Sequence, residues 1–466
     1  MNKFKIENLR SGSKIHMIGI GGISMSALAD ILIYFGYEVS GSDVVKSPLT
    51  EKLVAKGATI YIGQSDENIK SPDLVCYTAA VKEDNPEYMR AKELGIPTIE
   101  RAELLGIMMT NYDLPLAVAG THGKTTTSSL ITHLMITGGM KPSAIVGGVM
   151  NNYETNSVLG DSDWIVAEAD ESDGSFLRLN KMVSVVTSMD PEHLDYYGSV
   201  EQMNLAYRHF LQTTSFYGFC VVCTDHPVVK ETIKEIKYRK IISYGLKDDA
   251  DVQAININVK SGELKFDIKV QDKTYTDFIL PMFGYHNILN ALAAFAVVYY
   301  NGMNVDKIRQ GLASFAGVQR RFTKRGSVNG INIYDDYGHH PEEIKATLKA
   351  AKEATPNNKV IAVFQPHRYS RFSDLMNEFI QSFDNADILL VADVYGAGEK
   401  PIENVNKEIF IEKMRRNNVF AVNNAQQMNE TIATIAKSGD LVIGLGAGDI
   451  SKWMTNLPNY LQERKS

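Results

Sequence analysis

Residues 117–129 read AVAGTHGKTTTSS and combine the residue types that hold nucleotide phosphates. Gly120 and Gly123 let the backbone wrap a phosphate, and a helix that starts after them would present free N–H groups to it. Lys124 can reach the outer phosphates, and the Thr125 hydroxyl can bind Mg²⁺. The spacing departs from the general G-x-x-x-x-G-K-[ST] pattern, because Val118 stands at the first glycine position. We predict a phosphate loop; the alternative is a strand-to-helix turn that binds nothing.

Acidic residues follow two predicted strands further along the chain. The apolar run WIVAEAD, 164–170, places Glu168 or Asp170 at its carboxyl end, where ligands gather in open α/β sheets. The segment MDPEHLD, 189–195, adds four candidates: Asp190, Glu192, His193 and Asp195. Mg²⁺ prefers hard oxygen ligands and takes few of them from protein. Either cluster alone could be a helix cap or a solvated turn, but both together beside a phosphate loop indicate a metal site.

A second glycine-rich turn, GIGGISMS, occupies residues 19–26. Asp43 follows at about the 20-residue distance at which an acid binds ribose in dinucleotide folds. Ser24 stands where G-x-G-x-x-G has its third glycine. The pattern predicts a bound nucleotide diphosphate; NAD, or a tight turn without a ligand, are the other interpretations.

The last third of the chain carries arginines and histidines that could hold an anion. They lie in QRRF (319–322), DDYGHHPEE (335–343) and FQPHRYSR (364–371). Arginines near a transferring phosphoryl group stabilise its charge. Arg368 and Arg371 are separated by i, i+3, so on a helical turn they would share a face and could clamp a carboxylate. For any single one of these residues, a surface position is the simpler interpretation.

Sheets are needed to position these residues, and strand and helix patterns alternate throughout the chain. Strands are predicted at 14–20, 38–43, 74–79, 115–120, 164–170, 182–189, 219–225, 331–336, 359–365, 388–394 and 441–447. Helices are predicted at 24–36, 125–139, 286–302 and 341–354. Alternating apolar and polar residues in 251–280 favour antiparallel strands there. The fold class is therefore α/β with parallel sheets.

The chain is too long for one ordinary core, since 466 residues predict about three domains. A composition of 44% hydrophobic and 22% charged residues is typical of a folded protein. We predict a first domain at 1–110, a second at 111–316 and a third at 317–466.

Charge and cysteine usage exclude several classes of partner. The formal net charge of −7 argues against nonspecific binding to nucleic acid or an anionic membrane. No signal peptide or window of ~20 apolar residues is visible. Cys76, Cys220 and Cys223 are expected in the core, because a zinc site at CVVC would need two more ligands. We expect a cytoplasmic protein, monomeric or weakly dimeric, with no nucleic-acid or membrane partner.

The order of these motifs resembles the Mur ligases. GIGGISMS, SGSD, GTHGKTTT, EADESDGSF, the HLD of MDPEHLDYYG, GYHNILNALAA, RRF, DDYGHHP and FQPHRYSR span residues from about 14 to 450 in the family's order. DDYGHHP and QPHRYSR look like the branch that adds the first amino acid. The resemblance implies a Rossmann-like N-terminal domain for a UDP-sugar, a central P-loop ATPase domain with a mixed sheet, and a Rossmann-like C-terminal domain that closes over the site. It also implies ATP-dependent ligation of L-alanine to UDP-N-acetylmuramate through an acyl phosphate, with ATP and Mg²⁺ as cofactors.

The resemblance also assigns roles to individual residues. Lys124, Glu168 and His193 match catalytic positions, and Thr125, Glu168 and His193 match Mg²⁺ ligands. The ATP-binding set is Gly120, Thr121, His122, Gly123, Lys124, Thr125, Thr126, Asn290, Arg321 and Asp336. The UDP-sugar set is Gly19, Gly21, Gly22, Ser24, Ser42 and Asp43. The incoming amino acid would be held by Tyr337, His367, Arg368 and Arg371.

One departure from the family concerns the second metal. Several sibling ligases use a carbamylated lysine shortly after the HLD-type motif, whereas residues 194–229 contain no lysine here. Alternatives stay open at the level of the sequence. A related ligase could reattach a recycled peptide to the same UDP-sugar, and glycine or serine could be accepted in place of alanine. An NAD-dependent oxidoreductase would explain only the N-terminal turn, and a P-loop switch or regulatory ATPase would hydrolyse ATP without a carboxylate and amine pair.

Overall fold

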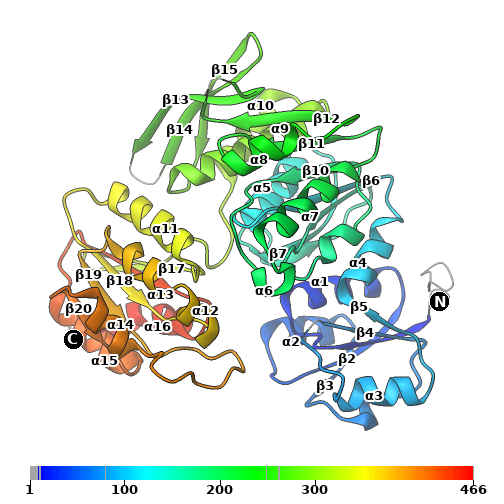
Figure 1. Cartoon of the computed structure of the whole chain (residues 1–466), viewed down its shortest axis with the longest axis horizontal. Coiled ribbons are helices and arrows are strands. Elements are labelled where there is room, and N and C mark those ends of the chain that lie inside the picture. Colours follow the sequence, from blue (N-terminus) through cyan, green and yellow to red (C-terminus); the bar gives the residue numbers. More distant parts are fainter. Residues whose placement is uncertain (1–8, 10–11, 79, 248, 261–262, 465–466) are drawn as a thin grey trace. The chain divides into compact units, whose positions relative to one another are not determined.

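The structure is a computed structural model that describes residue 9 and residues 12–78, 80–247, 249–260 and 263–464. Its strands form three sheets of five, ten and six strands, and helices accompany each of them (Figure 1). By internal contacts the chain divides into two units. The first holds the five-stranded sheet and most of the ten-stranded sheet, and the second holds the six-stranded sheet. The predicted α/β class is confirmed.

The N-terminal sheet is wholly parallel, with strand order β3-β2-β1-β4-β5. Its elements are β1 (Lys14–Ile18), α1 (Ile23–Tyr34), β2 (Glu38–Asp43), α2 (Pro48–Ala55), β3 (Thr59–Ile62), η2 (Asp66–Asn68), β4 (Leu74–Tyr77), α3 (Pro86–Glu93), β5 (Thr98–Glu100) and α4 (Arg101–Met109). The chain reverses direction across the sheet between β1 and β4. In such sheets ligands bind outside the carboxyl ends of the strands at this switch point, and the 19–26 turn follows β1 there.

The ten-stranded sheet is mixed, in the order β15-β14-β13-β12-β11-β10-β6-β9-β7-β8. Its strands are β6 (Leu114–Ala119), β7 (Ser143–Met150), β8 (Thr155–Val158), β9 (Trp164–Glu168), β10 (Val183–Val186), β11 (Phe219–Cys223), β12 (Lys240–Gly245), β13 (Val252–Lys260), β14 (Glu263–Val270) and β15 (Lys273–Leu280). Its helices are α5 (Lys124–Thr137), η3 (Ser175–Arg178), α6 (Leu194–Tyr197), α7 (Val200–Gln212), α8 (Pro227–Ile233), α9 (Tyr285–Tyr300) and α10 (Val305–Ser314). Strand β6 lies between β9 and β10 and is parallel to both. The segments that follow these three strands therefore leave the sheet at the same edge.

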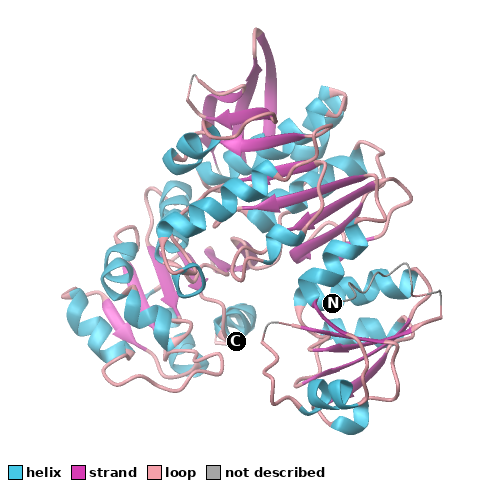
Figure 2. Cartoon of the chain, turned by 45° about the vertical axis from the view of Figure 1, so that its right-hand side comes forward, coloured by secondary structure: helices cyan, strands magenta, loops and turns pink. Residues whose placement is uncertain are grey.

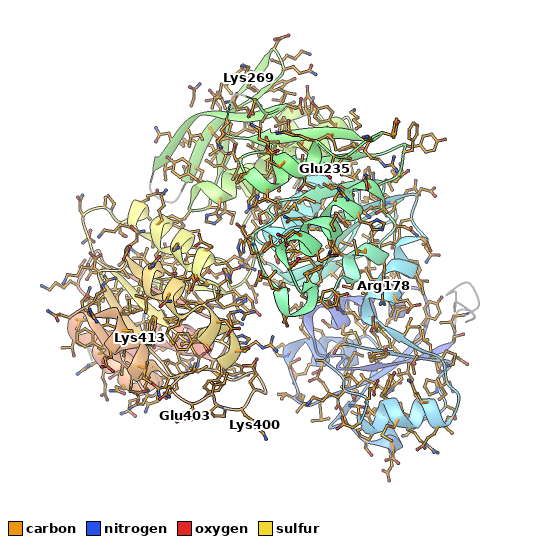
Figure 3. All side chains as sticks on the ribbon, in the orientation of Figure 1. Arg178, Glu235, Lys269, Lys400, Glu403 and Lys413 are labelled. Carbon is orange, nitrogen blue, oxygen red and sulfur yellow. The ribbon has the colours of Figure 1, made fainter. Side chains whose placement is uncertain are left out.

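Two further predictions concern the antiparallel strands of this sheet and the cysteines of the chain. The two-residue turn between β14 and β15 requires antiparallel pairing, as expected for 251–280, although residues 261 and 262 lie outside the described part of the chain. Cys76, Cys220 and Cys223 are buried free thiols, which confirms their place in the core. In the segment between β9 and β10, Arg178 of η3, labelled in Figure 3, lies 2.7 Å from Glu100 of β5 and so connects to the N-terminal sheet.

The six-stranded sheet has the order β16-β17-β21-β18-β19-β20, with β16 antiparallel at one edge. Its elements are β16 (Thr323–Val328), β17 (Ile331–Asp336), α11 (Pro341–Ala354), β18 (Val360–Phe364), α12 (Tyr369–Asp374), α13 (Met376–Ile380), η4 (Gln381–Phe383), β19 (Ile388–Val391), α14 (Lys407–Met414), β20 (Val419–Ala421), α15 (Ala425–Ile435), β21 (Leu441–Leu445) and α16 (Ile450–Glu463). The sequence predicted four of these strands and missed the two edge strands. β16 carries Lys324, Arg325 and Gly326, and β20 has only three residues.

Helices flank the sheets as layers when the chain is coloured by secondary structure (Figure 2). Among the residues that the structure describes, no helix combines the length and apolar character needed to cross a membrane. Most of α5 is buried although it is rich in threonine and serine. The hydroxyls of Ser128, Thr132 and Thr137 bond to carbonyls of the preceding turn, Thr132 to Ser128 O at 2.8 Å, so these three polar side chains each have a hydrogen-bond partner within the helix.

A buried polar cluster joins α3 to the strands of the N-terminal sheet. The Glu87 carboxylate is fully buried and accepts hydrogen bonds from the Ser42 hydroxyl and the Asn68 amide, each at 2.5 Å. His16 Nε2 lies 3.7 Å from the same carboxylate. Burial alone would raise the pKa of Glu87, but the hydrogen bonds from these partners hold it below its ordinary value. The cluster fixes Ser42, which precedes Asp43 at the end of β2.

We expect Glu87→Ala to lower the free energy of unfolding by about 3 kcal/mol, because it leaves buried partners of a charged group unsatisfied. Urea denaturation of the full-length protein measures the effect. Glu93→Ala on the same helix is the matched control, since Glu93 is exposed and pairs only with Arg90 at the surface. Equal effects of the two substitutions would contradict the account of this cluster.

Candidate functional site

The phosphate loop owes its shape to glycines in the left-handed region of backbone conformation. Gly120 has φ 135° and Gly123, the N-cap of α5, has φ 84°. A Cβ on Gly123 would lie 2.5 Å from Asn290 Oδ1, so strain and a steric clash both exclude a side chain there. Because Gly123 provides no capping side chain, the first N–H groups of α5 face the loop as donors for an anion.

The other loop residues are tied to the segment after β10. The Thr121 hydroxyl donates to Asp190 O at 2.9 Å, and the His122 N–H donates to Ser188 Oγ at 2.9 Å. Thr126 is buried in the first turn of α5. Hydrogen bonds to Asp190 and Ser188 therefore fix the position of the loop.

Asn290, which the resemblance assigns to the ATP-binding set, lies on α9. Its Oδ1 accepts a hydrogen bond from the Thr127 hydroxyl at 3.1 Å and stands against Gly123. The structure thus brings Asn290 directly to the phosphate loop.

Lys124 is partly buried and turned back over the loop. Its Nζ lies 2.7 Å from Gly120 O, 3.1 Å from Thr121 O and 2.7 Å from Glu171 Oε1. Burial would lower the pKa of Lys124, but the attraction of Glu171 and the other nearby carboxylates outweighs it and raises the pKa. The ammonium group therefore stays charged at neutral pH and can meet phosphate oxygens.

Thr125 and Glu168 supply adjacent oxygen ligands. The Thr125 hydroxyl is 2.9 Å from Glu168 Oε1, and the Gly147 N–H donates to Glu168 Oε2 at 2.7 Å. A hydroxyl beside a carboxylate at a phosphate loop suits the oxygen preference of Mg²⁺. The structure brings together two of the three predicted metal ligands here.

A second group could hold another cation. Within the described part of the chain, Glu171, Glu192 and His193 each offer a ligand atom, and these atoms lie within 4.8 Å of one another. His193 has φ 55°, a left-handed conformation that is uncommon for residues other than glycine. The carboxylates of Glu171 and Glu192 therefore accompany His193, and the following residues 194–229 contain no lysine.

Glu171 is the residue that sequence reasoning missed. It lies in EADESDGS, which contains four acidic residues, and their spacing does not show which side chain points into the protein. The structure turns Glu171 inward, with 3% of its side chain exposed. Burial raises its pKa to about 7, while Lys124 opposes that rise. The feature that identifies Glu171 is its contact with Lys124, and this contact exists only in the folded structure.

A pocket links the phosphate loop to the N-terminal sheet. It contains about 520 Å³ of empty space, part of it open to solvent. The residues that line it belong partly to the helices of the N-terminal sheet and partly to the region of the ten-stranded sheet: Ser24, Leu28, Arg101, Leu105, Lys124, Ile145, Val146, Glu168 and Asp170. Arg101 lies 3.4 Å from Asp170 across it. The pocket thus brings the predicted UDP-sugar residue Ser24 and the predicted ATP residue Lys124 to one cavity.

The N-terminal glycine turn is pinned to the end of β2. The N–H groups of Gly19 and Ile20 both donate to Ser42 O, at 2.8 and 3.0 Å. The Gly21 N–H donates to Asp43 Oδ2 at 2.8 Å, and a Cβ on Gly21 would lie 2.7 Å from that oxygen. Ser42 and Asp43 therefore shape the turn. The Ser42 hydroxyl donates its hydrogen bond to Glu87.

Gly22 completes the turn as the N-cap of α1, without a capping side chain. As at the phosphate loop, the first N–H groups of the helix are left for an anion such as a pyrophosphate. Direct binding of a UDP-sugar by the residues of this turn stays a prediction.

The second unit holds the remaining predicted residues. Asp336 is buried and accepts the N–H groups of Phe322 and Gly338, at 2.8 and 2.7 Å. Burial raises its pKa, although Arg321 opposes the rise. The Arg321 guanidinium lies 5.5 Å from the Tyr337 ring centre and 3.5 Å from Glu343.

Arg368 and Arg371 do not share a helical face, which corrects the sequence prediction. Arg368 has φ 69° and precedes α12, because its N–H donates to Tyr395 O at 2.8 Å and delays the start of the helix. Its guanidinium lies 2.9 Å from Glu399. Arg371 is helical and lies 3.5 Å from His367 Nδ1. The His367 ring stacks on Tyr395, with ring centres 5.6 Å apart, so His367 and Arg371 remain the close pair.

Comparison with known proteins places this chain in a family. Residues 14–113 match the Mur ligase family catalytic domain, 118–298 the Mur ligase middle domain and 320–448 the Mur ligase glutamate ligase domain. The chain belongs to the Mur ligase family. This confirms the resemblance and the three-domain architecture, while the predicted boundaries at 110 and 316 stay predictions.

Individual relatives are similar over nearly the whole chain. The chain is 45% identical to the UDP-N-acetylmuramate–L-alanine ligase of Caulobacter vibrioides over 456 residues, 96% of each protein. It is 45% identical over 457 residues to the enzyme of that name from a Bradyrhizobium species, covering 96% of this chain and 97% of the relative. A crystal structure of UDP-N-acetylmuramate–alanine ligase from Thermotoga maritima superposes with a TM-score of 0.83 at 28% identity, covering 97% and 99% of the two chains. A murein peptide ligase from Psychrobacter arcticus shares the fold, with a TM-score of 0.75 at 24% identity over 97% and 99% of the chains.

The surroundings of His367 predict a pH effect on stability. Burial, His339 and two arginines lower the pKa of His367 to about 4. In the unfolded chain the same imidazole takes a proton near pH 6.5. Between these values the unfolded state binds more protons, so the free energy of unfolding falls as the pH is lowered.

Because His367 is only partly buried, we expect a loss of about 1 kcal/mol from about pH 7.5 to about pH 5.5, relative to His367→Gln. Urea denaturation of both proteins at several pH values measures the difference. Parallel stability profiles would contradict the lowered pKa.

Proposed function

We propose that this protein joins L-alanine to the lactyl carboxylate of UDP-N-acetylmuramate, using ATP and an acyl phosphate, in the synthesis of peptidoglycan precursors. The observation that carries the proposal is the pocket in which Lys124 and Glu168 meet Ser24 of the N-terminal turn. Relatives that are 45% identical over 96% of the chain bear the name of this activity. An oxidoreductase would leave the phosphate loop and both groups of acidic residues without a use.

The reaction needs two steps, because a carboxylate is a poor acyl donor in water. A lactyl carboxylate oxygen attacks the γ-phosphorus of ATP and ADP leaves, which gives the acyl phosphate. The neutral amine of alanine then attacks the carbonyl carbon and loses a proton. The tetrahedral intermediate collapses, the C–O bond to phosphate breaks, and inorganic phosphate leaves with the former carboxylate oxygen. Charge develops on oxygens in both steps, and preorganised cations and N–H donors lower that cost.

The chain's own groups match these demands. The charged Lys124 would lie against the outer phosphates, and the backbone of the 120–126 segment would hold the phosphate chain, with the N–H groups of Thr121 and His122 bonded to Ser188. The carboxyl and hydroxyl oxygens of Thr125 and Glu168 fit one Mg²⁺, and Glu171, Glu192 and His193 fit a second. When bound, Mg²⁺ supplies positive charge that neutralises phosphate oxygens.

The other predicted residues keep their proposed roles. Gly19, Gly21, Gly22, Ser24, Ser42 and Asp43 would bind the UDP-sugar, and Asn290, Arg321 and Asp336 would each contact ATP. Tyr337, His367, Arg368 and Arg371 would hold alanine. His367 is uncharged at neutral pH and can accept a hydrogen bond from an ammonium group. We also propose a cytoplasmic monomer or weak homodimer, with domains at 1–110, 111–316 and 317–466.

ADP release in the presence of ATP, Mg²⁺ and UDP-N-acetylmuramate tests the function. Adding L-alanine is expected to release ADP and give a product whose mass equals the sum of the two substrates less one water. Glycine, serine and a cell-wall tripeptide serve as competing amine donors. ADP release that depends on the tripeptide and not on alanine would assign a peptide-recycling ligase instead.

Lys124→Ala is expected to reduce turnover at least about a thousandfold, since it removes a preorganised charge from the phosphate site. Binding of UDP-N-acetylmuramate should stay within about twofold of the wild-type value, because the glycine turn lies on another sheet. Isothermal titration with the nucleotide sugar and steady-state ADP release measure the two effects. Lys273→Ala, an exposed lysine of β15, is the control. Loss of UDP-sugar binding in Lys124→Ala would refute the assignment of the two nucleotides to separate turns.

A further inference from the structure

His122 belongs to the proposed ATP-binding loop, but its side chain has no role in the reaction described above. Its backbone is held at both ends by the segment after β10. The N–H donates to Ser188 Oγ at 2.9 Å, and the carbonyl accepts from the Thr187 hydroxyl at 2.5 Å. These two hydrogen bonds fix the backbone of His122, and with it the path of the loop between Gly120 and Gly123.

The side chain of His122 faces a carboxylate shared with a second histidine. Asp190 Oδ2 lies 3.7 Å from His122 Nε2, and Asp190 Oδ1 lies 3.1 Å from His226 Nε2. All three side chains are partly buried, with 23%, 35% and 16% exposed for His122, Asp190 and His226. Each carboxylate oxygen thus faces a different imidazole.

The order of strands explains how three distant residues meet. His122 follows β6, Asp190 follows β10 and His226 follows β11, and these strands are parallel neighbours in the order β6-β10-β11 (Figure 1). Their carboxyl ends lie at one edge of the sheet, so the three segments are brought together by topology and not by a local motif.

His226 has a defined hydrogen-bonding state in this arrangement. It is the N-cap of α8, and its Nδ1 accepts the Val229 N–H at 3.5 Å. An imidazole whose Nδ1 accepts carries a proton on Nε2, so Nε2 donates to Asp190. The cap therefore orients the ring that fixes the Asp190 carboxylate.

We propose that His226 is a positioning residue for ATP, which acts through Asp190 on His122 and so keeps the phosphate loop in its ligand-ready shape. The inference rests on the proposed binding of ATP at this loop. A loop whose donors are already aligned loses less conformational freedom when the phosphates bind, and that difference appears in affinity. His226 itself touches no substrate.

Two substitutions separate this role from helix capping. His226→Asn keeps a strong N-cap for α8 but is too short to reach Asp190. His226→Gln is a poor cap, yet its amide can place a donor near the position of Nε2. A positioning role predicts that Asn weakens ATP binding and Gln largely preserves it, whereas a capping role predicts the reverse.

The measurement is the affinity of the full-length protein for ATP with Mg²⁺ and, separately, for UDP-N-acetylmuramate, by isothermal titration, with thermal unfolding as a check on folding. For His226→Asn we expect ATP to bind about fivefold to tenfold more weakly, which is within the range for the net loss of one ordinary hydrogen bond, because the effect reaches ATP only indirectly. The KM for ATP should rise similarly, with kcat and UDP-sugar binding changed less than about twofold. His209→Asn, an exposed histidine of α7, is the control.

Three outcomes would overturn the inference. They are wild-type ATP binding in His226→Asn, weaker binding in Gln than in Asn, or a parallel loss of UDP-sugar affinity and thermal stability. Failure of the wild-type protein to bind ATP at all would instead refute the proposed function, so the two failures can be told apart.

Discussion

The buried contact between Lys124 and Glu171 is the interaction on which the rest of the site depends. The two groups lie 2.7 Å apart, with 17% and 3% of their side chains exposed. Burying an ion pair is costly unless further polar groups complete it, and two loop carbonyls do so for Lys124. Lys124 and Arg101 supply two positive charges beside the carboxyl groups of Glu168, Asp170 and Glu171. The clustered carboxyl oxygens are the ligand type that divalent cations prefer, and a bound cation would in turn favour the phosphates of a nucleotide.

The order of the strands determines where these charged side chains lie. Because β6 lies between β9 and β10, the phosphate loop leaves the sheet between two acidic segments, one with Glu168 and Glu171 and the other with Glu192 and His193. The same edge of the sheet continues to β11 and His226. A single parallel arrangement thus supplies the lysine, both candidate metal groups and the residues that support the loop. Chemistry and support come from the ends of strands whose interiors are apolar and buried.

Sequence patterns were sufficient for much of this arrangement. The apolar runs before Gly120, Glu168 and Asp190 predicted β6, β9 and β10, because short β-branched runs bounded by polar residues are typical of parallel strands. Glycine and lysine spacing predicted the loop and α5. These features are local, so the residues that carry them lie next to one another in the chain.

What the sequence could not predict depends on contacts between distant segments. The inward turn of Glu171 depends on Lys124, and the non-helical conformation of Arg368 depends on its bond to Tyr395. His226 has no motif around it and reaches the loop only through strand order. The edge strands β16 and β20 were not predicted, because β16 is charged and β20 is short, so neither shows an apolar period.

The central claim is that phosphorylation activates the carboxylate, and the fate of its oxygen tests that claim most directly. UDP-N-acetylmuramate labelled with ¹⁸O in the lactyl carboxylate is turned over with ATP, Mg²⁺ and L-alanine, and the inorganic phosphate is analysed by mass spectrometry. An acyl phosphate predicts that one labelled oxygen passes to each phosphate released. Phosphate without label, formed alongside the amide product, would contradict the account.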